Sequence, residues 1–305
     1  MPNNSSKIEI KAKDKNASKL VTAMQGWSDS LKQFEVKPQG VFGSEAQVKC
    51  GNVTIKSAEL DLEFTCKFDD DMEANEAEIT VYNLSKNTIS QIKNKAAISI
   101  TAGYKGDTGV VFDGFVDRVK TKYEGVDKVT TIYCLDDVKD HGIQSISFAA
   151  NTKASYILKT LLGKTGIPIA VFNMRRDYKY DSEQTVEGDL MENIKKFSEV
   201  CGVSTYVNKG KIYSRYIKDG DNINFTVKEE TGMIGSPTEF EEEQTAEDFK
   251  ETVKGYNITM LLQHRMTTAA IINLTSINAT NGKYRVRSGR HVFNDSEAIT
   301  EIEVI

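Results

Sequence analysis

NEAEITVYNLSKNTISQIKNKAAISITAGYKGDTGVVFDGFVDRV, residues 75–119, is the stretch of sequence that decides the fold. Apolar and polar residues alternate over its first positions, which predicts a strand with one buried face. Ser85 then stands where a helix N-cap is expected, because Ile89 and Ile92 behind it have helical spacing. Alternation resumes up to a turn predicted at Lys105–Gly109 and continues beyond it. The stretch therefore predicts a small β-module of three strands with a short helix at one end.

The composition is that of a soluble globular protein. The chain has 305 residues, of which 39% are hydrophobic and 27% are charged. This length suits two or three domains that together bury roughly 75% of the unfolded surface. The formal net charge of −5 argues against a dedicated nucleic-acid binder, so we expect no sequence-specific nucleic-acid binding. No apolar run is long enough for a membrane span or a signal peptide, so we expect no stable membrane insertion and a cytoplasmic protein.

Changes in residue pattern divide the chain into four segments. Residues 1–45 form a leader, residues 46–147 a first β-rich domain, residues 148–218 an α+β insert, and residues 219–305 a second β-rich domain. The predicted fold class is therefore α+β, mainly β.

The leader contains an amphipathic helix. Its apolar residues recur at spacings of three and four, which gives a wide apolar face. They include Leu20, Met24, Trp27, Leu31 and Phe34. Such a helix can dock on its own domain, or it can be an arm that docks on a neighbouring subunit or another partner, and the sequence leaves both interpretations open.

Glycines mark the expected ends of the later elements. In the insert, one helix is expected to end at Gly163 and another to lie between Gly188 and Gly202. A hairpin that turns at Asn208–Gly210 is expected next. In the last segment, Asn281–Gly282 is a further hairpin signal.

The sequence contains no signature of catalysis or cofactor binding. Gly163-Lys164-Thr165 is similar to the end of a phosphate-binding loop, but Leu158 stands where that motif needs a glycine. No base lies next to a nucleophile in the chain. We therefore expect no catalytic residue, no cofactor and no metal site.

Two acidic stretches and four cysteines have ordinary structural explanations. Residues 69–73 predict a solvated turn, with binding of a divalent cation as the alternative. Glu239–Glu243 predicts a solvated edge or loop, with a contact to a partner ring as the alternative. The four cysteines lie far apart in the chain and are expected to be reduced thiols, mostly in β-rich cores.

Several segments, taken in order, resemble the baseplate hub proteins of contractile-tailed phages and phage-tail-like bacteriocins. They are NEAEITVYNLS, ITAGY, VFDGFVDRV and TIYCLDD within residues 75–137, and GYNITMLLQHRMTTAAIINLTS and GKYRVRSGRH within residues 255–291. The resemblance covers residues 46–305. The candidate assembly residues in these segments are Asn75, Glu78, Tyr82, Asn83, Leu84, Gly103, Tyr104, Gly114, Asp136, Leu261, Leu262, Gly282, Tyr284 and Val286. Leu261 and Leu262 are expected to lie in one strand.

The resemblance implies two tube-like β-barrel domains flanking the insert, and a structural rather than an enzymatic role. Three chains would form a homotrimeric ring that adapts the three-fold central spike to the six-fold tail tube and initiates tube assembly. The implied partners are the tail tube protein, the central spike protein, other baseplate proteins that face the insert and, as a further candidate, the tape-measure protein. The implied location is the tail baseplate of a virion or bacteriocin particle, assembled in the cytoplasm of the bacterial host. The alternatives are a tail-associated binding module for a cell-surface ligand and a cell-wall hydrolase.

Overall fold

The computed structural model describes residues 43–136, 142–208, 210–246 and 249–305. The predicted leader helix lies outside these residues. Residues Gly43–Ile305 form one unit around three clusters of buried apolar side chains. One cluster lies in each β-rich region and one in the insert, so the three parts are described in turn.

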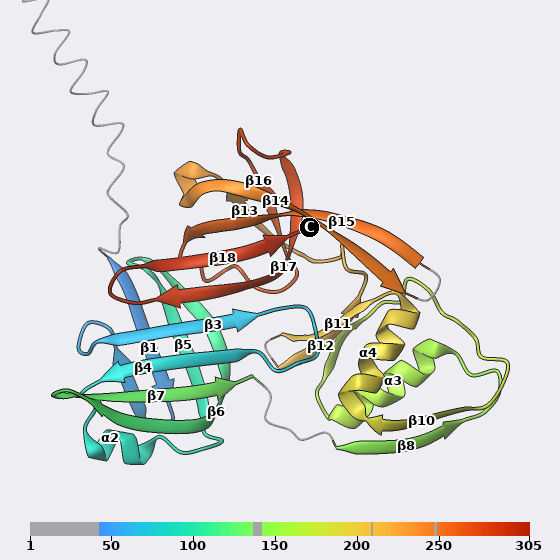
Figure 1. Ribbon diagram of the computed structural model, residues 1–305, viewed down its shortest axis with the longest axis horizontal. Helices are drawn as coiled ribbons and strands as arrows, with labels where there is room; N and C mark the ends of the chain where they lie inside the picture. Colours follow the sequence, from blue (N-terminus) through green and yellow to red (C-terminus); the bar gives the residue numbers. More distant parts are fainter. Residues whose placement is uncertain (1–42, 137–141, 209, 247–248) are drawn as a thin grey trace, which may run out of the picture. The chain divides into compact units, whose positions relative to one another are not determined.

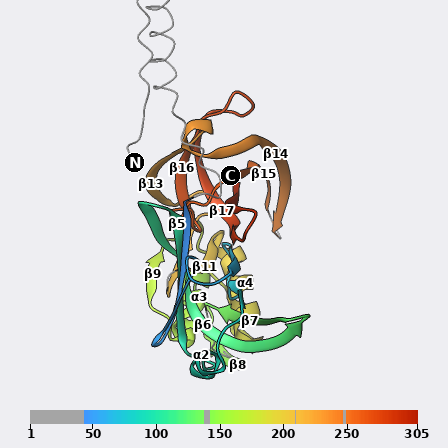
Figure 2. The same ribbon diagram turned by 90° about the vertical axis from the view of Figure 1, so that its left-hand side faces the viewer.

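Residues 75–119 fold as their pattern predicts. They form β4 (Glu76–Tyr82), α2 (Lys86–Gln91), β5 (Ala97–Tyr104) and the first part of β6 (Asp107–Glu124). The Ser85 hydroxyl accepts a hydrogen bond from the Thr88 backbone N–H at 3.0 Å, so Ser85 caps α2. Figures 1 and 2 both place α2 beside one end of these strands.

The turn between β5 and β6 is shorter than predicted. Tyr104 pairs with Asp107, so only Lys105 and Gly106 form the loop. Gly106 has φ +88°, a conformation that a two-residue hairpin loop needs and that glycine adopts without strain. The prediction of a turn through Gly109 is wrong, because the register of the ladder and not local polarity decides where the strand resumes.

Besides β4, β5 and β6, the first β region contains four further strands. These further strands are β1 (Ser44–Cys50), β2 (Val53–Lys56), β3 (Leu62–Phe68) and β7 (Asp127–Leu135). The spatial order is β2-β1-β5-β6-β7-β4-β3. In β1 and β3 every second side chain is buried, which is the two-residue period expected of strands with one face on a core.

The insert contains two helices and two small sheets. Its elements are β8 (Ile143–Phe148), α3 (Ala154–Thr165), β9 (Ile169–Phe172), β10 (Gln184–Asp189), α4 (Leu190–Cys201), β11 (Ser204–Asn208) and β12 (Lys211–Arg215). β8 pairs with β10, and β12 lies between β11 and β9. Most of β8 precedes the predicted domain boundary at residue 147, yet the one strand that pairs with it among the described residues, β10, is in the insert. The predicted domain limits stay a prediction.

One helix of the insert ends later than predicted. α3 continues to Thr165, and Gly166, with φ +70°, is its left-handed C-cap. Gly163 lies inside the last turn with no atom within 4 Å of where a Cβ would be, so it does not end the helix. α4 is bounded as predicted: the Asp189 carboxylate accepts from two backbone N–H groups of the first turn, and Gly202 has φ +64°.

The second β region supplies the remaining strands. They are β13 (Asp221–Val227), β14 (Met233–Ala246), β15 (Phe249–Leu261), β16 (Ala270–Leu274), β17 (Gly282–Phe293) and β18 (Ala298–Val304), with the 3-10 helix η1 (Glu229–Thr231) after β13. The hairpin signalled by Asn281–Gly282 exists between β16 and β17. Leu274 pairs with Gly282, however, so the connection is the longer loop 275–281 and Gly282 already belongs to the strand.

The two β regions share one sheet of 13 strands. β3 of the first region pairs with β17 of the second, from Phe64 opposite Phe293 to Phe68 opposite Gly289, as Figure 1 shows. Side chains also cross the boundary between the two β regions. Leu262 packs in the apolar cluster of the first β region, and Phe68 packs in that of the second β region. A mainly β fold with a few helices is thus confirmed, whereas the two tube-like barrels stay a prediction.

Candidate functional site

Asn75 and Asp136, 61 residues apart in the chain, meet where β4 begins and β7 ends. The backbone N–H and the side-chain amide of Asn75 donate to the Asp136 carboxylate at 2.8 and 2.7 Å. The Asn75 side-chain oxygen accepts from the backbone N–H of Asp69 at 3.0 Å. These bonds fix β4 and β7 to the loop that follows β3, which is a structural role for both predicted residues.

Asn83 and Leu84 end β4. Asn83 has φ +58°, and its amide donates to the Asp127 carboxylate at 2.9 Å while its oxygen accepts from the Lys128 backbone N–H at 3.0 Å. Asparagine tolerates this left-handed conformation better than most residues. Leu84 is buried in the first apolar cluster.

Glu78 and Tyr82 lie on the outer face of β4. Glu78 is exposed and Tyr82 is partly buried. The negative charge of Glu63, together with some burial, raises the pKa of the Tyr82 hydroxyl. Neither side chain belongs to the first apolar cluster.

Gly103 and Gly114 allow close approach of neighbouring strands, and Tyr104 bonds across the two β regions. A Cβ on Gly103 would lie 2.2 Å from a carbonyl oxygen of β6, and a Cβ on Gly114 would lie 2.4 Å from one of β7. Any larger residue would push these strands apart. The Tyr104 hydroxyl donates to the Ala298 carbonyl at 2.9 Å, so it ties β5 to β18 across the two β regions.

The predicted residues of the second β region lie in its core or near its boundary with the first β region. Leu261 ends β15, and Leu262 follows the strand instead of continuing it. The Leu262 side chain is 3% exposed. Val286 is buried in the second cluster, and the Tyr284 ring lies edge-on to a tyrosine of β15 with centroids 5.4 Å apart. A Cβ on Gly282 would make only an ordinary contact, 3.8 Å from the Tyr284 ring, so the identity of this residue has no steric explanation.

The candidate docking helix of the leader is not part of this site. Leu20, Met24, Trp27, Leu31 and Phe34 lie outside the described residues. Their role as an arm stays a prediction.

The acidic loop 69–73 connects β3 and β4, as predicted, but only part of it is solvated. Asp70 is only 13% exposed, and its carboxylate pairs with the Arg285 guanidinium at 2.7 Å. Arg287 lies on the other side of the same carboxylate at 3.8 Å. Met72 is buried in the cluster of the insert. The Asp70 carboxylate lies at this low exposure because two guanidinium groups offset its desolvation, whereas Asp71 and Glu73 are exposed.

Arg285 connects the three parts of the molecule. Its guanidinium is 1% exposed, and besides the Asp70 carboxylate it donates to the Asp219 carbonyl at 2.9 Å. The same group lies 5.8 Å from the centre of the Tyr206 ring. The Tyr206 hydroxyl accepts from Arg215 at 2.6 and 2.9 Å. A polar network thus passes from the first β region through β17 to the insert.

The backbone of the loop is held as well. The Asp69 carbonyl accepts from the Thr268 hydroxyl at 2.8 Å, and the Asp70 carbonyl accepts from the Ser204 hydroxyl at 2.7 Å. Burial, followed by the nearby Asp71 charge, raises the pKa of the Asp69 carboxyl to about 6. A carboxyl group with this pKa is only partly ionised under mildly acidic conditions.

His291 is unsuited to acid–base catalysis. It is 1% exposed, with Nε2 at 3.1 Å from the Met266 carbonyl and Nδ1 at 2.8 Å from the Thr300 hydroxyl. A carbonyl only accepts hydrogen bonds, so Nε2 carries the proton and Nδ1 accepts from the hydroxyl. Burial lowers the pKa of His291 to about 4. Both ring nitrogens are therefore engaged: Nδ1 joins β17 to β18, and Nε2 joins β17 to the loop before β16.

The chemistry of the described residues favours no metal or thiol site. Among them, no group of three or more His, Cys, Asp or Glu side chains is placed to hold a metal ion. Cys50, Cys66, Cys134 and Cys201 are free and buried, and burial raises the pKa of each thiol, to about 12 for Cys134 and Cys201. Thiols with such pKa values stay protonated and are poor nucleophiles and ligands.

Within the described ranges, no helix combines the length and the apolar character that crossing a bilayer requires.

The large sheet is branched among the described residues. Its main path ends at β2 and at β14, and its branch through β16 ends at β13. β14 is long, and it contains the acidic run Glu239–Glu243, which lies on an edge as its composition predicts. β6 and β7 form a long hairpin, which Figure 2 shows extending from the rest of the sheet. The apolar side chains of Tyr123 and Val126, near the turn of this hairpin, are exposed. Unpaired strand edges and exposed apolar tips are suited to contacts with other chains.

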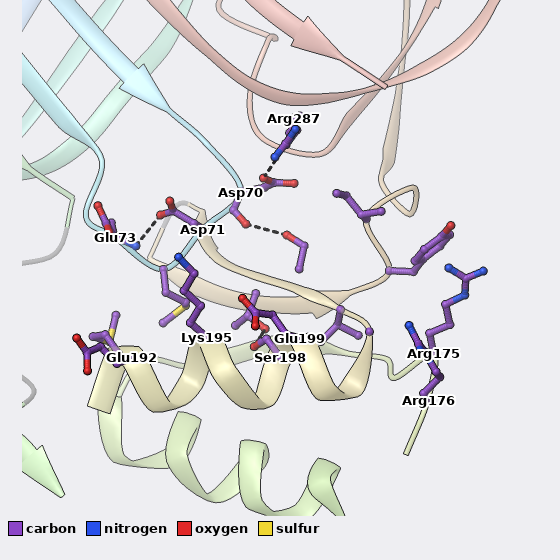
Figure 3. A pocket seen from close by; sticks show the side chains of 18 of the residues that line it. Asp70, Asp71, Glu73, Arg175, Arg176, Glu192, Lys195, Ser198, Glu199 and Arg287 are labelled. Carbon is purple, nitrogen blue, oxygen red and sulfur yellow. Dashed lines mark hydrogen bonds and ion pairs between the residues drawn. The ribbon is translucent and has the colours of Figure 1, made fainter. Parts of the chain in front are cut away.

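A cavity of about 730 Å³ adjoins the acidic loop. Figure 3 shows its walls: Asp70, Asp71 and Glu73 lie on one side and α4 on the other, with Arg175 and Arg176 at one end. Its lining is rich in charged side chains and has a smaller apolar part.

Sequence reasoning missed the residues of the polar network. They are Tyr206, Arg215, Arg285 and Arg287, together with the burial of Asp70. The alternation of Arg285 and Arg287 around Val286 indicates a strand, but such a pattern does not tell whether a charged face points to solvent or to a buried partner. Only the pairing of distant segments decides that.

Comparisons with known proteins agree on one group of relatives. The model of the family described as "Baseplate hub gp41" matches residues 73–291. A comparison with curated proteins found no match. Among solved structures, the fold is similar to the 43 kDa tail protein of prophage MuSo2 from Shewanella oneidensis, with a TM-score of 0.60 and 11% identity over 86% of this chain and 98% of that one.

Two further solved structures have a similar fold. A tail protein from Neisseria meningitidis MC58 has a TM-score of 0.59 and 8% identity, over 86% of this chain and 96% of the other. The c3393 protein of E. coli, a component of the type VI secretion system, has a TM-score of 0.55 and 10% identity, over 85% and 76% of the two chains. At such identities, the likeness concerns the fold alone.

Proposed function

The chain belongs to the baseplate hub gp41 family, and from this premise we propose that three copies of it form the ring that joins the central spike of a phage-type tail to the tail tube. Membership confirms the resemblance indicated by the sequence. It also assigns the chain a structural role in a phage tail, located at the baseplate. The trimeric ring, the start of tube assembly on it, and assembly in the host cytoplasm are our proposals.

One feature carries the proposal: each chain contributes two β regions, with separate apolar clusters, to a single sheet. Three chains would therefore present six β regions. A ring of this kind matches a six-fold tube on one side while it keeps the three-fold symmetry of a spike on the other. Each β region would adopt the tube-like form that the resemblance implies.

The ends of the sheet support a closed ring. β2 and β14 each have one edge without a partner strand among the described residues. Such edges pair readily with another chain, and closed rotational symmetry pairs them without forming an open filament. We propose that unpaired edges of neighbouring copies face one another, in interfaces of the size typical of permanent assemblies.

The proposed partners are the tail tube protein, the central spike protein, other baseplate proteins and the tape-measure protein. The proposed role is assembly and not turnover, since the thiols are buried and protonated and His291 is buried with both nitrogens engaged. The channel of the ring would be part of the conduit of the tail.

Single-particle imaging of assembled tails tests the proposal. The expected result is a three-fold ring between spike and tube, with two β regions from each chain around the channel. In solution, the purified chain with its spike partner is expected to have the mass of three chains of 34.0 kDa plus the spike. Discrete monomers in solution, with no ring at this position in the particle, would contradict the proposal and favour a binding module.

A further inference from the structure

The two β regions repeat one arrangement of strands. In the first, the order β3-β4-β7-β6 places the hairpin of β3 and β4 beside the hairpin of β6 and β7. In the second, the order β14-β15-β18-β17 places the hairpin of β14 and β15 beside that of β17 and β18. Each strand of one region therefore has a counterpart in the other: in particular, β3 corresponds to β14, and β6 corresponds to β17.

β6 and β17 also change partners at corresponding places. The first part of β6 pairs with β5, and the first part of β17 pairs with β16. In both strands the register with the other strand of the hairpin then shifts, after Val116 in β6 and after Val286 in β17. Beyond this shift β17 pairs with β3, which joins the two regions. β6 has only β7 beside it there among the described residues, so one edge of residues 117–124 is free.

The counterpart of β3 also has a free edge. β14 pairs with β15 on one side, and on its other side no strand pairs with it among the described residues. In the sheet of one chain, six strands separate β14 from β6 (Figure 1). The partner of either edge would therefore come from another copy of the chain.

We propose that the free edge of β6 in one copy pairs antiparallel with the free edge of β14 in the next copy. The chain then uses one kind of junction twice, as β17 with β3 inside the chain and as β6 with β14 between copies. Three copies joined in this way close by rotation, and neither edge stays exposed. This inference rests on the proposed function, because it specifies an interface of the ring proposed there.

The second region contains a row of paired residues that ends on the free edge. The row crosses four strands, and its members in order are Val286 of β17, Val304, Tyr256 and Glu239 of β14. Val286 is the residue before the register shift, so it fixes the place of this row along β17.

The first region contains the corresponding row. It starts at Val116, the residue before the shift in β6, and passes through β7 and β4 to Cys66 of β3. Cys66 lies opposite His291 of β17, which is five residues beyond Val286. The junction inside the chain thus pairs the end of one row with the fifth residue after the start of the other.

The same register can be applied between copies. Thr121 is five residues beyond Val116, so it would lie opposite Glu239 of the next copy. Because the strands are antiparallel, Arg118 would lie opposite Glu242.

The charges on the two edges are complementary in this register. Arg118 and Lys120 lie on one face of β6, and both are exposed. Glu242 would be directly across from Arg118 and diagonal to Lys120, where opposite charges attract. Arg118 and Glu242 each have a charged neighbour in their own chain, Asp117 and Arg287, so the junction would extend these pairs into a network.

Disulfide trapping in assembled tails tests the pairing. In the variant Thr121→Cys/Glu239→Cys each chain carries one new thiol on each edge, and both positions are exposed. The four natural cysteines are buried, so they do not compete for oxidation. After mild oxidation, a denaturing gel without reductant is expected to show a species of three chains, which reductant returns to single chains.

The contribution of charge is tested on the same cysteine pair. Adding Arg118→Glu/Lys120→Glu puts like charges beside Glu242 and should lower the yield of the three-chain species by about tenfold. Lys86→Glu/Lys93→Glu makes the same change in charge at exposed positions next to α2, and it should leave the yield unaltered. Equal yields from the two charge variants would overturn the inference.

The matched control for the edge is Thr54→Cys/Glu239→Cys, which moves one thiol from β6 to an exposed position of β2, another end of the sheet. It is expected to give no three-chain species. A three-chain species from this control alone, or no cross-link in either cysteine variant although imaging shows a three-fold ring, would overturn the inference and leave the hub role intact. Tails whose baseplate contains no ring of this chain would overturn both.

Discussion

The buried pair of Asp70 and Arg285 gives the sharpest test of how the parts of the chain are held together. The substitution Asp70→Asn keeps the shape of the side chain and removes its charge, so a guanidinium that is 1% exposed loses its carboxylate partner. Breaking a buried ion pair on one side costs about 3–5 kcal/mol. We expect a loss of about 3 kcal/mol, because the Arg285 group keeps its bond to the Asp219 carbonyl.

Urea denaturation followed by far-ultraviolet circular dichroism measures this loss. With a slope of about 3 kcal/mol per molar urea, the midpoint should fall by about 1 M. The matched control is Glu301→Gln, which removes the partner of Arg290 in a pair whose side chains are 53% and 35% exposed. An exposed pair of this kind contributes less than about 1 kcal/mol.

A second variant separates the lost attraction from the charge left behind. In Asp70→Asn/Arg285→Met no unpaired buried charge remains, so stability is expected to recover in part relative to Asp70→Asn alone. The reasoning is refuted if Asp70→Asn shifts the midpoint no more than Glu301→Gln does. It is also refuted if the double variant is the less stable of the two Asp70 variants.

Three further predictions concern single residues that are buried or partly buried. Leu262→Glu puts a carboxylate into the first apolar cluster, where even truncation of a leucine to alanine costs about 2–5 kcal/mol of stability. The variant should therefore misfold and fail to enter tails. A soluble variant that assembles into tails would contradict this expectation. The raised pKa of Asp69, about 6, favours the folded state below pH 4, and this contribution is lost as the pH rises through 6. Asp69→Asn should therefore raise the thermal midpoint at pH 8 by the equivalent of roughly 2 kcal/mol, and no gain over the exposed control Asp113→Asn would refute it. The lowered pKa of His291, about 4, has the opposite effect on stability. The stabilisation by the neutral ring is complete above pH 6.5 and is lost, by up to about 3 kcal/mol, as the pH falls through 4. His291→Gln should therefore flatten the acid limb of a plot of stability against pH, and an unchanged acid limb would contradict this prediction.

The opposite signs of the two pH effects have a consequence for measurement. As the pH rises from 4 to 6, the Asp69 carboxyl contributes less to stability while the His291 ring contributes more. The stability of the unaltered protein should therefore depend only weakly on pH in this range. Asp69→Asn should expose the steeper slope of His291. The pair of variants therefore tests both residues in one series of measurements.

Local signals in the sequence predicted most secondary structure because they act over a few residues. Ser85 caps α2, and Asp189 and Gly202 bound α4, since a cap is a contact within one helical turn. The end of α3 was missed, because two glycines lie within four residues and only the backbone conformation tells which one is the cap. The end of the β5–β6 turn was missed because pairing across the ladder, and not polarity, sets it.

The candidate site was predictable only in part. Asn75 and Asp136 were chosen from their motifs, and the fold brings them into contact, although their role in assembly stays a prediction. The acidic loop was expected in solvent, since nothing near Asp70 in the sequence reveals a partner 215 residues away.

By itself, the sequence determined the alternating strands, the two helices of the insert and the membership in a family of tail hubs. Those features depend on residue periodicity, on caps and on ordered motifs, all of which are local in the chain. The tertiary structure decided that β3 pairs with β17, that Leu262 packs in the core of the other β region, and that Arg285 meets Asp70. These contacts join segments far apart in sequence, and their energies depend on burial, which exists only once the chain has folded.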